Sequence, residues 1–103
     1  MASGASKIAV GSFVGTGASK DVQAVGFRPK YVKLLNVTGS CQAEWVQGMA
    51  DASAQKVVDS GAGATDISLI TSGGVTPLAD GFTLGADTDL NVSGEMVRYV
   101  CFD

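Results

Sequence analysis

The sequence predicts an all-β protein, a compact antiparallel β-sandwich or small β-barrel of about 7–9 short strands. Three observations support this. Runs rich in β-branched and aromatic residues recur at spacings of about 8–12 residues and are separated by glycine-rich turns. No segment has the apolar spacing of an amphipathic helix. A Leu-Asn-Val run leads into a polar residue and a glycine at residues 35–39 and again at residues 90–94, which marks two places where a strand ends in a turn.

Composition is consistent with one β-domain. The 103 residues are 46% hydrophobic and 17% charged, against about 25% charged in an average domain. A chain with so little charge is expected to cover part of its surface with neighbouring subunits, or to expose many small polar residues. We expect residues 1–6 to form a flexible N-terminal arm and residues 7–103 to form a single β-domain.

The charge pattern disfavours two classes of partner. The net charge is −3 and the seven Lys and Arg residues are scattered, so the basic face that nucleic-acid binding requires is missing. No run approaches the roughly 20 apolar residues of a membrane span. The N-terminal residues also lack the charged and apolar regions of a signal peptide. We expect no nucleic acid and no membrane as partner, and synthesis in the cytoplasm.

Two strands are expected before residue 30. Residues 8–14 form the first, which stops at the glycines of residues 15–17. Residues 21–25 form a short second strand. A turn or bulge then follows at Arg28-Pro29, because proline cannot donate a hydrogen bond to a central ladder.

Residues 31–37 are the clearest strand, and residues 42–47 are expected to be its hairpin partner across a turn at residues 38–40. Alternation assigns the side chains of this strand to two faces. One face carries Val32 and Leu34, and the other carries Tyr31, Lys33 and Leu35.

The second half of the chain is less uniform. Residues 48–58 fit either a short helix capped by Asp51 or a loop that leads into a strand. Residues 67–71 alternate as a strand, with Ile67 and Leu69 on one face. Residues 81–85 form a short strand, and residues 90–92 pair with residues 95–102 as a closing hairpin.

The repeated turn signal does not indicate an internal duplication. In both copies a Gly-Phe pair precedes the Leu-Asn-Val run by seven residues. However, the intervening residues 30–34 read as a strand, whereas residues 85–89 read as a turn.

Two cysteines, Cys41 and Cys101, either form one disulfide or stay as buried thiols that act as small hydrophobic side chains. Because the chain has no secretion signal, we expect free thiols.

Nothing in the sequence predicts catalysis. The chain has no histidine, so the commonest general base and metal ligand is missing. Neither a cation nor a helix N-terminus is expected beside the cysteines to activate a thiol. Residues 15–20 resemble a phosphate-binding loop only loosely, because Ser19 precedes Lys20 and a strand follows, so we predict a hairpin turn. We expect no enzymatic activity and no cofactor.

Two short motifs have simpler explanations. Residues 87–91 match the first three ligands of a calcium loop, but Val92 and Arg98 occupy positions that require Gly and Glu. An EF-hand is excluded, and an acidic turn is favoured over a looser calcium site that includes Asp80. The sequons at Asn36 and Asn91 are interpreted as asparagines in strand-end turns, because the chain lacks a secretion signal.

Several segments, taken in order, resemble small virion structural proteins of tailed bacteriophages. The resemblance extends over roughly residues 7–102. The segments that carry it are Gly26–Val32, Asn36–Trp45, Gly48–Ala50, Ser53–Lys56, Ile70–Leu78, Gly81–Gly85 and Leu90–Val92.

This resemblance implies a β-rich protein on the outer surface of the virion, made in the host cytoplasm. It would be a capsid decoration (cement) protein that binds the major capsid protein and stabilises the shell by bridging subunits. Such proteins are frequently trimers, so a homo-oligomer, with a trimer favoured, is expected. The alternative is a tail-fibre or head-fibre module that binds a host surface glycan. Such a module should expose aromatic residues in turns, whereas the aromatics here lie mostly within or beside strands, which favours decoration.

Candidate contact residues follow as hypotheses. The N-terminal arm is the first, because it contains no core residues. The segment around Arg28 and Tyr31 is the second, because a segment interrupted by proline beside a strand tends to be a sheet edge. Trp45, together with Met49, is either an interface anchor or part of the core. The candidate interface residues are Ala2, Ser3, Gly4, Ala5, Ser6, Arg28, Pro29, Tyr31 and Trp45.

Overall fold

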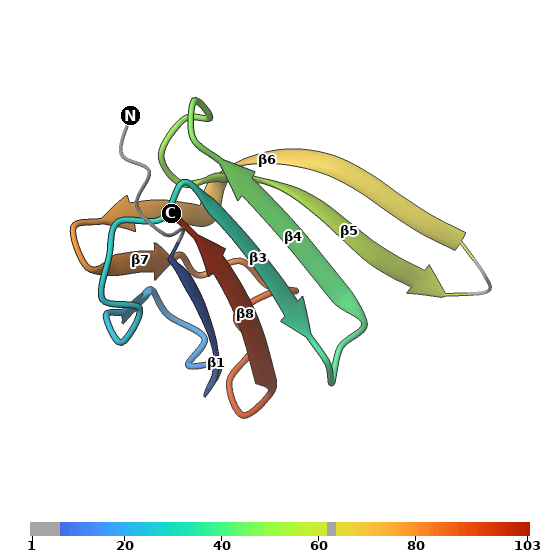
Figure 1. Ribbon diagram of the computed structural model, residues 1–103. Coiled ribbons are helices and arrows are strands. Elements are labelled where there is room, and N and C mark those ends of the chain that lie inside the picture. The colour runs from blue at the N-terminus through green and yellow to red at the C-terminus, as the bar shows by residue number, and fades with distance from the viewer. Residues whose placement is uncertain (1–6, 62–63) are drawn as a thin grey trace.

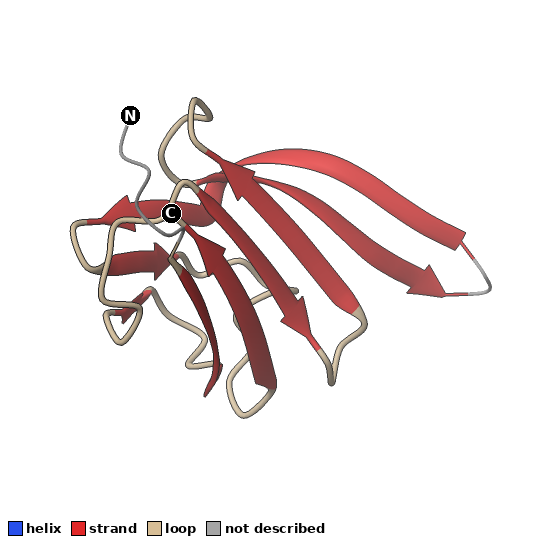
Figure 2. Cartoon of the chain, viewed as in Figure 1, coloured by secondary structure: helices blue, strands red, loops and turns tan. Residues whose placement is uncertain are grey.

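The computed structural model describes residues 7–61 and 64–103 and contains a single antiparallel sheet of eight strands (Figure 1). The described residues include no helix (Figure 2). The sheet curls into a half-barrel, which confirms the all-β prediction. The strands are β1 (Ile8–Val14), β2 (Lys20–Val22), β3 (Tyr31–Asn36), β4 (Cys41–Val46), β5 (Ser53–Gly61), β6 (Ala64–Leu78), β7 (Gly81–Leu84) and β8 (Met96–Phe102).

The strand order is β1-β8-β3-β4-β5-β6-β7-β2. Strands β3 to β7 form a meander in which each strand pairs with the next along the chain. The chain then crosses back, and β8 pairs with β3 on one side and β1 on the other. The sheet therefore has two edge strands, β1 and β2, which are not paired with each other.

The core fills the concave face of the curled sheet. Val32 and Leu34 of β3, which alternation assigned to one face, are both fully buried there. The Phe82 ring of β7 meets the Tyr99 ring of β8 edge-on, with 5.5 Å between ring centroids, a favourable geometry for two aromatic rings. Residues from opposite ends of the sheet order thus meet inside the half-barrel.

The loop of residues 85–95, which joins β7 to β8, closes the concave face. Leu90 is fully buried, and the side chain of Asn91 is buried beside it. This segment was predicted to be part of a hairpin at residues 90–92, which is wrong. The Asn91 amide donates to the carbonyls of Ala18 and Gly85 at 2.6 and 3.0 Å, so its polar groups are satisfied by loops rather than by a strand ladder.

Strand β6 bends sharply and pairs with two neighbours. Residues 64–70 pair with β5 and residues 75–78 pair with β7, and residues 71–74 lie out of register between them. Glycine makes the bend possible: Gly73 has a φ of +76°, and a Cβ on Gly74 would lie 2.4 Å from the carbonyl oxygen of Ser53. The strand predicted at residues 67–71 therefore continues through a bulge at Gly73-Gly74 as far as Leu78.

In two other segments the structure decides a prediction: one of two alternatives is confirmed, and a predicted hairpin turn is wrong. Residues 48–58 form a loop that leads into β5, the second of the two alternatives. Residues 15–19 are not a hairpin turn, because they connect β1 and β2 at opposite edges of the sheet. Pairing of β5 with the preceding strand β4 decides the first outcome, and pairing of β1 with β8 and of β2 with β7 decides the second.

Adjacent leucines on opposite faces of β3 test the assignment of the faces. Replacing Leu34, which is fully buried, with Ala is expected to lower the free energy of unfolding by about 2–5 kcal/mol. Replacing Leu35, which is exposed on the other face, should change it by no more than about 1 kcal/mol. Urea denaturation measures both. Equal losses for the two variants would contradict the register.

Candidate functional site

The convex face of the sheet, called here the outer face, carries most of the exposed large apolar side chains. They point away from the core because they alternate with core residues along each strand. On β6, Ile67 is 65% exposed and Leu69 is 66% exposed, and on β1, Val10 is 73% exposed. Exposed apolar residues in the described part of the chain are Ile8, Val10, Val14, Leu35, Val37, Val46, Ile67, Leu69 and Phe102.

Strand register arranges these residues in rows across the outer face. Phe102 lies between Ile8 and Tyr31, and Tyr31 lies opposite Val46. A second row runs from Leu35 through Gln42 and Val57 to Ile67. Side chains that are directly opposite on one face are close enough to touch. The first row is therefore a continuous line of aliphatic and aromatic side chains, whereas Gln42 interrupts the second.

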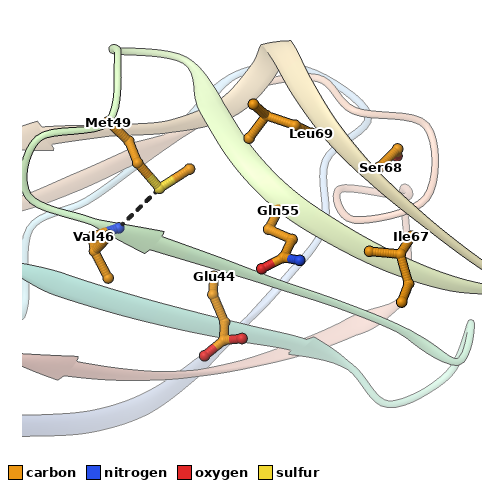
Figure 3. A pocket seen from close by; sticks show the side chains of 7 residues that line it. All are labelled: Glu44, Val46, Met49, Gln55, Ile67, Ser68 and Leu69. Carbon is orange, nitrogen blue, oxygen red and sulfur yellow. Dashed lines mark hydrogen bonds between the residues drawn. The ribbon is translucent and has the colours of Figure 1, made fainter.

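A groove of about 440 Å³ lies on the outer face between the loop after β4 and strand β6 (Figure 3). Its wall on the β4 side is held in shape locally, because the Val46 N–H donates to the Met49 sulfur at 3.3 Å. Exposed Leu69 and Ile67 form the opposite wall. The residues that line the groove are Glu44, Val46, Met49, Gln55, Ile67, Ser68 and Leu69.

Tyr31 lies beside this groove on the outer face. Its hydroxyl donates to the Glu44 carboxylate at 2.6 Å, and its ring lies 5.4 Å from the Phe102 ring. Burial, the hydrogen bond to Glu44 and the charge of that carboxylate raise the pKa of Tyr31 to about 12. The hydroxyl therefore stays protonated at neutral pH and anchors Glu44 beside the apolar rows.

The predicted contact residues are only partly brought together. Residues Ala2–Ser6 lie outside the described residues. Arg28, Pro29 and Trp45 line one pocket of about 220 Å³ at the end of the sheet. Tyr31 is on the outer face instead. The prediction that this segment is a sheet edge is wrong, because β3 lies between β8 and β4.

Trp45 belongs to the core. Its side chain is 3% exposed, and its indole N–H donates to the carbonyl of Ala50 at 3.2 Å. Of the two residues considered as an interface anchor, only Met49 lines the outer groove. Ile67 and Leu69 were recognised as sharing one face of a strand, but alternation does not reveal which face a sheet buries.

A buried cation fixes the closing loop to the sheet. Lys56 of β5 contacts the carboxylates of Asp87 at 3.0 Å and Asp89 at 2.7 Å. The Asp87 carboxylate also accepts from the backbone N–H groups of Asp89 and Leu90. Burial would lower the pKa of Lys56, but the hydrogen bonds to Asp89 and Asp87 outweigh this effect and raise the pKa. The predicted acidic turn is thus an anchor for the loop.

The same arrangement argues against the looser calcium site. Lys56 already neutralises both aspartates, whereas Asp80 lies in the turn between β6 and β7. No cluster of three or more His, Cys, Asp or Glu side chains suited to a metal ion occurs among the described residues.

Both sequon asparagines are buried and serve as structural ties. Asn36 accepts from the N–H groups of Thr38 and Gly39, and its amide donates to the carbonyl of Asp89 and to Glu95. Asn91 accepts from the N–H of Thr16 at 2.8 Å. Their amides are thus engaged inside the fold, as expected of asparagine in turns.

Both cysteines are free and buried, as predicted. Burial raises the pKa of Cys41 to about 11 and that of Cys101 to about 12. Since the thiolate is the nucleophilic form, neither thiol is activated at neutral pH.

The part of the chain that the structure describes has no helix of the length and apolar character that a membrane crossing requires.

The anchor of the closing loop predicts a large cost for removing its cation. The Lys56→Met variant is expected to lose about 3 kcal/mol of unfolding free energy, because it leaves the buried Asp87 carboxylate without its partner. Lys30→Met, at an exposed position, should change stability by no more than about 0.5 kcal/mol. Urea denaturation at pH 7 compares them. Similar values for the two variants would show that the ion pair does not stabilise the loop.

The buried thiols predict a loss of stability in alkali. An unfolded cysteine ionises near its usual pKa of 9.0, but the folded pKa values are about 11 and 12, so the native state holds more protons above pH 9. Stability should therefore be constant below pH 9 and fall as pH rises through this range, by at most about 1.4 kcal/mol per pH unit for each thiol. Urea denaturation between pH 8 and pH 10 measures the slope.

Cys41→Ala is the matched variant for this slope. In this variant, the free energy of unfolding should fall less steeply between pH 8 and pH 10 than in the unsubstituted protein. This holds whatever the change in stability at pH 8. An unchanged slope would assign the pH dependence to other groups.

Comparison with known proteins finds no match to a protein-family model, a curated protein or a solved structure. A functional proposal therefore depends on the sequence and on the surface of the molecule itself. Its most distinctive feature is the outer face, which combines rows of exposed apolar side chains with a groove.

Proposed function

We propose that this chain is a non-enzymatic structural protein of a bacteriophage virion, a capsid decoration protein that binds the outer capsid surface and stabilises it by bridging subunits. The apolar outer face is the observation that carries this proposal. Contiguous exposed apolar surface on a small domain marks an interaction site. The identification of the partner as the major capsid protein rests on the resemblance of the sequence to phage virion proteins.

The outer groove supplies a specific docking point. Ile67 and Leu69 are each about two-thirds exposed, so contact with a partner would remove most of their surface from water. Burying a large aliphatic side chain contributes about 1.5–3 kcal/mol. Glu44 and Gln55 in the same groove add polar partners that orient the contact. A few such anchors dominate the energy of most interfaces.

The shape of the molecule supports bridging. The chain measures 47 × 24 × 20 Å along its principal axes, and the β5–β6 hairpin extends beyond the other strands (Figure 1). One end of the long axis carries this hairpin, with Ile67 and Leu69. The exposed Phe102 lies on β8, which β3, β4 and β5 separate from β6 in the sheet order. A molecule with separated apolar contacts can touch two neighbouring capsid subunits.

The chemistry of the interior agrees with a non-enzymatic role. The chain has no histidine, and its two thiols have raised pKa values. The carboxylates of Asp87 and Asp89 pair with Lys56. These groups hold the fold together and are not arranged for acid–base or nucleophilic chemistry.

The aromatic residues favour decoration over a glycan-binding fibre module. All seven lie within the described residues, and Phe102, at 38%, is the one that is exposed. It belongs to β8 and packs beside Tyr31 rather than projecting from a turn. A glycan site built on aromatic stacking would need such side chains free on loops.

Re-binding to stripped capsids tests the proposal. The unsubstituted protein is expected to bind saturably and to raise the temperature at which the capsids rupture. Leu69→Lys places a charge in the outer groove and should weaken binding at least about 100-fold, because a charge must be desolvated at an apolar contact. Ala79→Lys is the matched control, since Ala79 is exposed in the turn between β6 and β7, and should bind normally.

Two results would overturn the proposal. One is binding of the unsubstituted protein without saturation and without any gain in heat resistance. The other is equal binding by the Leu69→Lys and Ala79→Lys variants, which would remove the outer groove from the contact.

A further inference from the structure

The two edges of the sheet differ in how they are protected. Edge strand β2 has three residues and carries the charged side chains of Lys20 and Asp21, two features that blunt an edge against further pairing. Edge strand β1 has seven residues, none of them charged and none of them proline. Its register with β8 is regular from Ile8 to Val14, without a bulge. An edge of this length and composition is a template for another strand.

The hydrogen bonds at both ends of β1 show which of its backbone groups have no strand partner in the part of the chain that the structure describes. Asp103 donates to the carbonyl of Lys7 at 2.9 Å, and Gly15 donates to the carbonyl of Glu95 at 2.8 Å. In an antiparallel ladder, residues alternate between facing the partner strand and facing away. The odd-numbered residues of β1 therefore face β8. The N–H and C=O groups of Ile8, Val10, Ser12 and Val14 point to the open edge.

We propose that two copies of this chain associate through this edge, with β1 pairing antiparallel to β1 of the second copy about a two-fold axis at Gly11. In this register Ile8 lies opposite the second copy's residue 14, and Val10 lies opposite its residue 12. All four open positions then form hydrogen-bonded pairs, which gives about eight new backbone hydrogen bonds. The two curled sheets become one continuous sheet.

The strand is complementary to itself, which is why a second copy fits this edge. The absence of charge on β1 means that no like charges meet across the axis. On the outer face, Ile8 meets Val14, so exposed aliphatic side chains cover each other. On the inner face, Phe13 meets Ala9, and both are partly buried against the core of their own chain. The axis passes through glycine, whose Cβ position is filled by the Tyr99 ring, with its hydroxyl at 2.4 Å.

This association goes beyond the proposed function, because it is independent of any capsid. A two-fold contact uses the same surface on both copies and closes after two. It also places the outer faces of the two copies side by side. In such a dimer the two outer grooves lie at a fixed separation. A partner that binds one groove can therefore also contact the second.

Proline substitution distinguishes this pairing from other contacts. Val10→Pro removes an N–H that faces the open edge and leaves the ladder to β8 intact, since proline is tolerated on edge strands. Val10→Thr is the matched control, because it also removes the exposed aliphatic side chain but keeps the N–H. Sedimentation equilibrium of the purified full chain should give a dimer for the unsubstituted protein and for Val10→Thr. For Val10→Pro, the dissociation constant should rise at least about tenfold.

Amide hydrogen exchange of the unsubstituted protein gives a second, independent measurement. Pairing at the edge should protect the amides of Ile8, Val10, Ser12 and Val14 at high protein concentration and release them on dilution. The amides of Ala9, Gly11 and Phe13 should stay protected throughout. Five results would each overturn the proposal. Two are a monomer at all concentrations and a trimer. Two others are fast exchange at the even positions of β1 in concentrated protein and dimerisation that Val10→Pro leaves unchanged. The last is protection of the even-position amides only when capsids are added.

Discussion

A single curled sheet can bury only one of its two faces, and the rest of this structure depends on that constraint. The concave face holds Leu34, Phe82 and Tyr99. Residues outside the strands complete this core: Leu90 of the loop of residues 85–95, and Val25 and Phe27 between β2 and β3. Apolar residues on the convex face have no such cover among residues 7–61 and 64–103, so the architecture of this part of the chain leaves them exposed.

Polar side chains, rather than apolar packing alone, hold the covering loop in place. Lys56 reaches it from β5, Asn36 reaches it from the end of β3, and Asn91 ties it to the segment after β1. Buried polar groups are costly unless each is satisfied, and the described residues contain no buried side-chain nitrogen or oxygen without a hydrogen-bond partner. Satisfied networks of this kind favour one arrangement of a loop over many alternatives.

Local patterns predicted the strands well where alternation was clear and glycine marked the end of a strand. Strands β1, β3 and β4 lie close to their predicted ranges, because alternation and hairpin turns are short-range properties. The errors fall at residues 90–92 and at residues 71–78. In the first, a buried asparagine satisfies its amide with distant loops. In the second, a strand that was predicted to end at residue 71 continues through a bulge at a glycine pair to residue 78. Neither outcome can be predicted from about ten consecutive residues, because the deciding partners lie elsewhere in the chain.

The candidate site shows the same division. Residue types and their alternation were enough to predict an all-β chain and the side chains that share a face on a strand, because these properties depend on a period of two. Only the tertiary structure decided which face is buried, that Trp45 lies inside, that Ile67 and Leu69 lie outside, and that β1 is an open edge. Those outcomes depend on the strand order and the curl of the sheet, which are set by contacts between residues far apart in the chain.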